Sequence, residues 1–279
     1  MTDYTNLSTS ELLKKSKIPL EIVDDDDDIY YDIVREMVNE IKKNNKLNKN
    51  TVMIVPVGPV FQYRRFVRLA KMEKLDCQNV YIFNMDEYLT DEKKWLPIDH
   101  PLSFRGFMQK EFFSRLSGVS KILEDHHFFP EPGNEAFYWK KMQELGGVDL
   151  AIGGIGIRGH IAFNEALDFE QNMSNKEFSN LSTRVLHLTK ETKTINSVTG
   201  LGGYIDGIPN WCISVGMKEL LSAKKMRFYC NREWQKGIVR KVCLDEVSGH
   251  TPATFLQTHP DAKLTITSYA ALPPGGIIR

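Results

Sequence analysis

The sequence predicts an α/β fold: a doubly wound, mostly parallel sheet with helices on both faces, in a Rossmann-like arrangement. Short runs of β-branched and apolar residues alternate along the chain with longer segments whose apolar residues recur at helical spacing. Strands that are apolar throughout are typical of parallel sheets, because helices cover both of their faces. No repeat and no low-complexity linker divides the chain, so we expect residues 1–279 to form a single domain.

The acidic run Asp24–Asp28 is predicted to begin the first long helix. Apolar residues follow it at helical spacing from Ile29 to Ile41, and negative charges stabilise the N-terminus of a helix. A solvated loop and a calcium site are the alternatives. A calcium loop spaces its carboxylates with a Gly and a terminal Glu, however, and this run has neither.

Strands and helices then alternate. Strands are expected at the short apolar runs Thr51–Val57, Asn79–Met85, Val148–Gly153, Trp211–Val215, Arg227–Cys230 and Lys263–Thr267. Helices are expected at the longer segments Phe61–Lys74, Ser103–Leu116, Glu135–Leu145 and Trp234–Val242. In open parallel sheets, reactive groups gather beyond the carboxyl ends of the strands. Polar residues directly after a predicted strand are therefore the first candidates for a site.

Composition narrows the class of protein. The chain has 36 basic and 36 acidic side chains, so it has no excess positive charge with which to neutralise nucleic-acid phosphates. Its longest apolar runs, such as Val52–Val57, fall far short of the roughly 20 residues of a membrane helix. The first residues lack the basic and apolar stretches of a secretion signal, and the four cysteines lack CxxC spacing. We therefore expect a cytoplasmic protein without a zinc site or a disulfide framework.

Three segments place polar or glycine-rich sequence directly after a predicted strand. The first, Pro56–Phe61, runs from a strand through a glycine turn into a helix. Such a turn can direct backbone N–H groups at an anion. A plain turn with Pro59 at the first helical position explains the pattern equally well, because proline has no N–H and no hydroxyl side chain is present.

The second segment, Phe83–Tyr88, carries two adjacent carboxylates at the end of a strand, Asp86 and Glu87. A carboxylate in a cleft has a raised pKa and can act as a general base. A helix cap or an acidic pair on the surface is the alternative that the sequence leaves open.

The third segment, Gly153–Glu165, contains a GxGxxG pattern from Gly154 to Gly159. The pattern occurs in dinucleotide sites, but a long helix should follow it and none is predicted here, so a nicotinamide or flavin cofactor is not expected. The loop presents His160, with Glu165 five residues later. A histidine held by a carboxylate is an acid–base unit that titrates near neutral pH.

Together these segments resemble the glucosamine-6-phosphate deaminase (isomerase) family in order and spacing. The matching residues are Asn84–Tyr88, His100–Phe104, Gly159–Glu165, Ser182–Val185, Thr192, Asn196, Ile213–Gly216 and Gln257–Pro260. The resemblance covers roughly residues 30 to 270. The related 6-phosphogluconolactonases usually read Asp-Glu-Arg and Gly-His-Thr-Ala at two of these places. This chain reads Asp-Glu-Tyr and Gly-His-Ile-Ala there and sides with the deaminases.

The resemblance implies an activity. In this family the ring of an aminosugar phosphate opens, the C2 proton moves to C1 through an enediol-type intermediate, and ammonia leaves, without a metal or an organic cofactor. By position, Asp86 would move the C2 proton, His160 would open the ring and Glu165 would orient His160. Arg184 and Lys236 match the family's cationic contacts to the substrate phosphate. A homo-oligomer is also plausible from the resemblance.

The chain departs from the family pattern in two loops. Arg158 stands where the family usually has an Asp, and a cation beside the imidazole of His160 disfavours imidazolium, unless Arg158 contacts a substrate anion instead. The family's Pro-Thr-Gly-Gly/Ser-Thr-Pro phosphate cradle is replaced by Pro56–Phe61, which lacks both hydroxyls. Each lost hydrogen bond to a charged group costs about 1.5–3 kcal/mol, so phosphate affinity in the family's pose should fall.

The expected catalytic residues are Asp86, His160 and Glu165, and no metal ligands are expected. The candidate substrate-binding residues are Gly58, Glu87, Arg158, Gly159, Arg184 and Lys236. The favoured function is an aminosugar-phosphate deaminase/isomerase with an altered substrate, acting on a small sugar phosphate. The alternatives are a catalytically weak sugar-binding or regulatory protein on the same fold, and a 6-phosphogluconolactonase-like hydrolase.

Overall fold

The computed structural model describes residues 4–275 and contains two sheets. The main sheet pairs all its strands in parallel, in the order β1-β10-β9-β6-β2-β3-β5. Its strands are β1 Leu20–Val23, β2 Thr51–Val55, β3 Val80–Asn84, β5 His127–Phe128, β6 Leu150–Gly154, β9 Lys225–Cys230 and β10 Ala262–Thr267. The smaller, antiparallel sheet has the order β4-β8-β7, from β4 Asp86–Leu89, β7 Arg184–His187 and β8 Trp211–Ser214. The predicted mostly parallel α/β fold is confirmed. The predicted strand Trp211–Val215 exists, but it belongs to the antiparallel sheet.

Each segment that the sequence predicts to be helical contains a helix in the structure. They are α1 Thr9–Lys15, α2 Asp26–Lys46, α3 Gln62–Glu73, α4 Phe104–Glu111, α5 Glu135–Glu144, α6 Asn175–Ser179, α7 Lys190–Gly200, α8 Met217–Leu221 and α9 Lys236–Leu244. The acidic run does begin a helix, because the Asp25 carboxylate accepts hydrogen bonds from the backbone N–H groups of Asp27 and Asp28. Pro59 does not begin α3, which starts three residues later, at Gln62. No helix within residues 4–275 is both long and apolar enough to cross a membrane.

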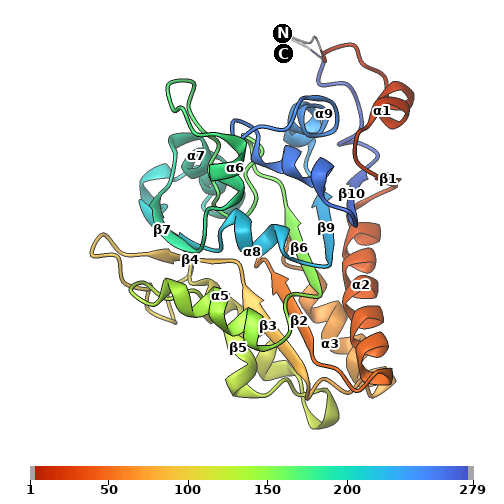
Figure 1. The fold of residues 1–279 in the computed structure, drawn as a ribbon, viewed down its shortest axis with the longest axis vertical. Helices are drawn as coiled ribbons and strands as arrows, with labels where there is room; N and C mark the ends of the chain where they lie inside the picture. Colours follow the sequence, from red (N-terminus) through yellow and green to blue (C-terminus); the bar gives the residue numbers. More distant parts are fainter. Residues whose placement is uncertain (1–3, 276–279) are drawn as a thin grey trace.

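Both faces of the main sheet are buried because successive strand residues point to opposite sides. In β2, Ile54 packs in the core shared with α5 and α9, and its neighbour Met53 packs in the core shared with α2 and α3. Figure 1 shows α2 and α3 together on one side of the strands, with α5 on the other. This two-sided burial explains why the strands read as unbroken apolar runs.

The order of the strands creates a crevice between β2 and β6. From β2 the chain proceeds to β3 and β5 on one side, whereas from β6 it proceeds to β9 and β10 on the other. The loops that leave β2 and β6 therefore diverge at the carboxyl ends of the strands, where ligands bind in open α/β sheets. Met85 joins the small sheet to this edge, because its N–H donates to Val55 O at 2.9 Å and its carbonyl accepts from Val215 N at 2.7 Å.

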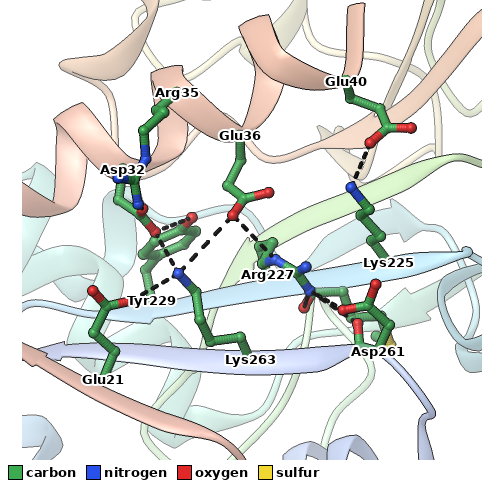
Figure 2. A network of polar contacts seen from close by, with 11 residues as sticks. Glu21, Asp32, Arg35, Glu36, Glu40, Lys225, Arg227, Tyr229, Asp261 and Lys263 are labelled. Atoms are coloured by element: carbon green, nitrogen blue, oxygen red, sulfur yellow. Dashed lines mark hydrogen bonds and ion pairs between the residues drawn. The ribbon is translucent and has the colours of Figure 1, made fainter. Parts of the chain in front are cut away.

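A network of charged side chains joins α2 to β9 and β10 (Figure 2). Lys263 Nζ lies 3.2 Å from Asp32 Oδ2, which also accepts from Tyr229 OH at 3.1 Å. Glu40 accepts hydrogen bonds from Lys225 Nζ at 2.7 Å and from Lys43 Nζ at 3.1 Å. Because these carboxylates are buried, each needs its cationic partner, and the pairs fix α2 against the sheet.

The Glu40→Gln substitution is expected to lower the free energy of unfolding by about 1–3 kcal/mol at pH 7, because it removes a buried, doubly hydrogen-bonded charge. Burial alone would raise the pKa of Glu40, but the hydrogen bonds from Lys225 and Lys43 outweigh it and lower the pKa. The stabilisation by the Glu40 carboxylate is therefore fully present above the pKa of a glutamate in the unfolded chain, about 4.3. It is lost as the pH falls through the pKa of Glu40 in the folded protein.

Urea denaturation at pH 7 and near pH 4 measures this effect. The control is Glu73→Gln, which breaks the exposed ion pair with Lys42 and is expected to change stability little. An equal loss of unfolding free energy in both variants would contradict this role of Glu40. So would a difference in stability between Glu40→Gln and the unmodified protein that does not narrow at low pH.

Candidate active site

A cavity of about 390 Å³ opens at the crevice between β2 and β6, a volume suited to a small ligand. It is lined by residues 56–60 after β2, by residues 154–156 at the carboxyl end of β6, and by Asn231, Arg232, Trp234 and Gln235 after β9. Asp86 and His160, which are far apart in the sequence, both line it. The carboxylate and the imidazole that the sequence singled out therefore converge on a single cavity.

Asp86 is held at the junction of the two sheets. It is the first residue of β4 and pairs with Ser214 of β8, directly after the Met85 link. Its side chain is buried, and this burial, together with the neighbouring charge of Glu87, raises the pKa of the Asp86 carboxyl to about 8. A carboxyl with such a pKa can both accept and return a proton near neutral pH.

Glu87 points away from the cavity. It is fully buried, and its carboxylate accepts hydrogen bonds from the backbone N–H groups of Tyr88, Phe104 and Arg105 and from the Ser103 hydroxyl. The structure therefore gives Glu87 the capping role that the sequence had left open and does not bring it to the predicted substrate position. Adjacent strand residues face opposite sides, so only one of the two carboxylates can reach the cavity.

Glu87→Gln is expected to shift the pH profile of kcat/KM. A base with a pKa near 8 gains activity as the pH rises through that value, and removal of the adjacent carboxylate lowers the pKa of Asp86. The acid limb of the profile should therefore move to lower pH, which a pH–rate series would measure. An unmoved limb in a folded variant would show that Glu87 does not tune Asp86.

His160 is backed by a carboxylate and a hydroxyl. Its Nδ1 lies 3.4 Å from Glu165 Oε2 and 3.4 Å from Thr192 Oγ1, and Thr192 Oγ1 donates to Glu165 Oε2 at 3.0 Å. Burial opposes ionisation of Glu165, but hydrogen bonds with His160, Thr192 and the Thr189 N–H outweigh burial and lower the pKa of its carboxyl. An ionised Glu165 favours a proton on Nδ1, which leaves Nε2 free to exchange protons.

Two glycines, Gly156 and Gly159, shape the loop that carries His160. A side chain at Gly156 would place its Cβ 1.9 Å from His160 Nε2, so the imidazole packs where any other residue would have a side chain. Gly159 adopts a φ of +83°, and a Cβ there would lie 2.8 Å from the Thr251 methyl group. Gly159 does not line the cavity, so the structure gives it a role in the turn rather than the predicted contact with substrate.

The three predicted cations do not line the cavity. Arg158 forms an ion pair with Asp168 at 2.8 Å and donates to Leu167 O, so the prediction that it faces a substrate anion is not met in this structure. Arg184 donates to Asn164 Oδ1 at 2.8 Å and thereby braces the loop behind His160. Lys236 is the first residue of α9.

The loop of residues 56–60 presents an apolar wall. Of the residues predicted to bind substrate, Gly58 is the one that lines the cavity, with Val57, Pro59 and Val60 beside it. The absence of hydroxyls that the sequence shows in this loop is therefore a property of this wall of the cavity.

The polar lining residues that the prediction missed include Tyr88, Asn196 and Arg232. The Tyr88 hydroxyl accepts a hydrogen bond from Asn196 Nδ2 at 2.8 Å, and both side chains line the cavity. Arg232 lines it at the end of β9. The position of Arg232 directly after a predicted strand was the available signal. Within residues 4–275, no group of three or more His, Cys, Asp or Glu side chains is placed to hold a metal ion.

Comparisons with known proteins identify relatives. No family model matches the chain. Glucosamine-6-phosphate deaminase from Parabacteroides distasonis is 32% identical over 229 residues, which are 78% of this chain and 76% of that protein. The enzyme of the same name from Halothermothrix orenii is 30% identical over 229 residues, 81% of this chain and 88% of that protein.

Solved structures agree with these relatives. A monomeric glucosamine-6-phosphate deaminase has a TM-score of 0.77 at 25% identity. The match covers 91% of this chain and 99% of the chain of that deaminase. A 6-phosphogluconolactonase from Trypanosoma brucei shares the fold alone, with a TM-score of 0.66 at 14% identity, covering 92% of this chain and 98% of its own. A parallel α/β sheet with a carboxylate and a histidine at its switch point is suited to acid–base chemistry on a small ligand. The chain belongs to the glucosamine-6-phosphate deaminase family.

Proposed function

We propose that this protein converts glucosamine-6-phosphate, or a closely related aminosugar phosphate, to the ketose phosphate and ammonia. The observation that carries the proposal is the convergence of Asp86 and His160 on one cavity. Family membership supports it, and so do the raised pKa of Asp86 and the carboxylate behind His160.

Ring opening is assigned to His160. The closed sugar opens when the C1 hydroxyl loses a proton and the ring oxygen gains one. An imidazole can accept the first proton and donate the second through Nε2. Glu165 and Thr192 hold the opposite nitrogen, which fixes the orientation of the ring.

Proton transfer between C2 and C1 is assigned to Asp86. The carboxylate takes the C2 proton of the open aminoaldose, and O1 takes a proton from the neighbouring ammonium group, which leaves an enolamine. The protonated Asp86 carboxyl then returns its proton to C1, which gives a 2-iminium sugar. Water then adds to C2 and ammonia leaves, so one water is consumed and the ketose phosphate is formed without oxidation or reduction. The ammonium group of the substrate lies next to C2, and its charge favours the ionised carboxylate that this step requires.

The direct test is incubation of the purified protein with glucosamine-6-phosphate, followed by assays for ammonia and fructose-6-phosphate. Equal amounts of both products are expected. Binding without turnover would favour the sugar-binding alternative, which the apolar loop of residues 56–60 motivates. Hydrolysis of 6-phosphogluconolactone in place of ammonia release would favour the lactonase alternative.

Two further properties belong to the proposal. A cytoplasmic location is expected for an enzyme of small metabolites and is checked by cell fractionation. A homo-oligomer stays a prediction, and light scattering of the eluted protein would measure the assembly.

A further inference from the structure

Arg232 is a cationic residue of the cavity wall that has no role in the proposed mechanism. Arg232 is exposed and is the only Lys or Arg among the described residues that line the cavity. Its backbone exchanges hydrogen bonds with Gln235, at 2.8 Å and 3.0 Å. Its guanidinium has no hydrogen-bond or ion-pair partner within residues 4–275, so its donors are available to a ligand.

The other nearby cations are already engaged or lie elsewhere. Arg184 is bound by Asn164 and by the Ser182 carbonyl, and Arg158 is paired with Asp168. Neither lines the cavity. An anion that enters the cavity therefore meets Arg232 as its first positive charge.

The loop of residues 56–60, which lines the same cavity, increases the need for this charge. Val57, Pro59 and Val60 contribute apolar surface to the cavity wall, and none of them has a side-chain donor. An oxyanion taken out of water must regain its hydrogen bonds, and a planar guanidinium can bind two of its oxygens at once.

The segment that carries Arg232 is held rigidly. Asn231 O accepts a hydrogen bond from Tyr269 OH at 2.9 Å, and its side-chain amide donates to Tyr30 OH at 3.4 Å. On the other side, Gln235 Nε2 donates to Ile155 O at 2.7 Å, in the loop that leads to His160. The backbone of Arg232 is thereby fixed relative to the histidine, so only the side chain of Arg232 has to be ordered when a ligand binds.

We infer that Arg232 is the specificity-determining contact for the terminal phosphate of the substrate, a task that the apolar loop of residues 56–60 does not share. The inference rests on the proposed function for the identity of the sugar. The binding of the oxyanion is a separate property and can be measured without turnover.

Calorimetric titration with glucose-6-phosphate, which has no amino group to lose, tests the inference. Arg232→Ala is expected to weaken binding about 10- to 100-fold, and Arg232→Lys should restore part of the loss. Arg68→Ala removes an exposed arginine of α3 that does not line the cavity and serves as the matched control, with binding unchanged. In turnover, Arg232→Ala should raise KM for glucosamine-6-phosphate and leave kcat almost unchanged, because the phosphate takes no part in the bond changes.

The outcomes separate the two proposals. Unchanged affinity in a folded Arg232→Ala protein, or no detectable binding of glucose-6-phosphate by the unmodified protein, overturns the inference. Arg232-dependent binding without any release of ammonia supports the inference and overturns the proposed deaminase function.

Discussion

The Asp86→Asn variant is expected to release ammonia from glucosamine-6-phosphate with a kcat roughly 10²–10⁴-fold below that of the unmodified protein. The amide has nearly the shape of the carboxyl but cannot take the C2 proton. Binding of sugar phosphate should stay within a few-fold, because the substitution leaves Arg232 and the loop of residues 56–60 untouched. Steady-state ammonia assays, with calorimetric titration of glucose-6-phosphate, measure the two effects separately.

The control for this variant is Glu40→Gln, which changes a buried carboxylate outside the cavity. It should keep the kcat of the unmodified protein at a temperature well below its own unfolding. More than a tenth of normal turnover in Asp86→Asn would mean that another group moves the proton.

Gly156→Ala is expected to reduce kcat/KM by about 10²-fold or more, because the new methyl group would lie 1.9 Å from Nε2 and 2.0 Å from Cε1 of His160. The imidazole must then turn out of the position in which Glu165 holds it. The loss should therefore approach that of His160→Gln, which removes the acid–base group itself.

Gly237→Ala is the matched control, since a Cβ at Gly237 meets no atom within 4 Å. It lies in the first turn of α9 and should leave activity unchanged. Thermal unfolding of both variants checks that they fold. Normal activity in a folded Gly156→Ala protein would show that the position of the imidazole is not required.

Much of the fold could be predicted because the strands of the main sheet are buried on both faces. β2 and β6 read as unbroken apolar runs, and the 3.6-residue period of α2 is strong. β1 and β7 have four residues each and are only partly buried, so neither gives a clear pattern. The short helix α1 did carry a signal, the capping box of Ser8 and Glu11.

The site was partly predictable for a topological reason. Asp86 comes after β3 and His160 after β6, so both lie at the edge of the main sheet where its parallel strands end. The rule that ligands bind at this edge also points to Arg232, which comes after β9. Sequence position alone does not give the direction of a side chain. Glu87 turns to the opposite face of β4, and Arg158 meets a carboxylate ten residues further on, at Asp168.

The central claim is that Asp86, His160 and one aminosugar phosphate meet in the same cavity. A crystal structure with 2-amino-2-deoxyglucitol 6-phosphate, an open-chain analogue that cannot complete the reaction, measures this directly. We predict that an Asp86 carboxylate oxygen lies beside C2, that His160 Nε2 lies within hydrogen-bond distance of the C5 hydroxyl, and that the phosphate lies at Arg232. A ligand bound outside this cavity, or one that touches only one of the two acid–base residues, would contradict the account.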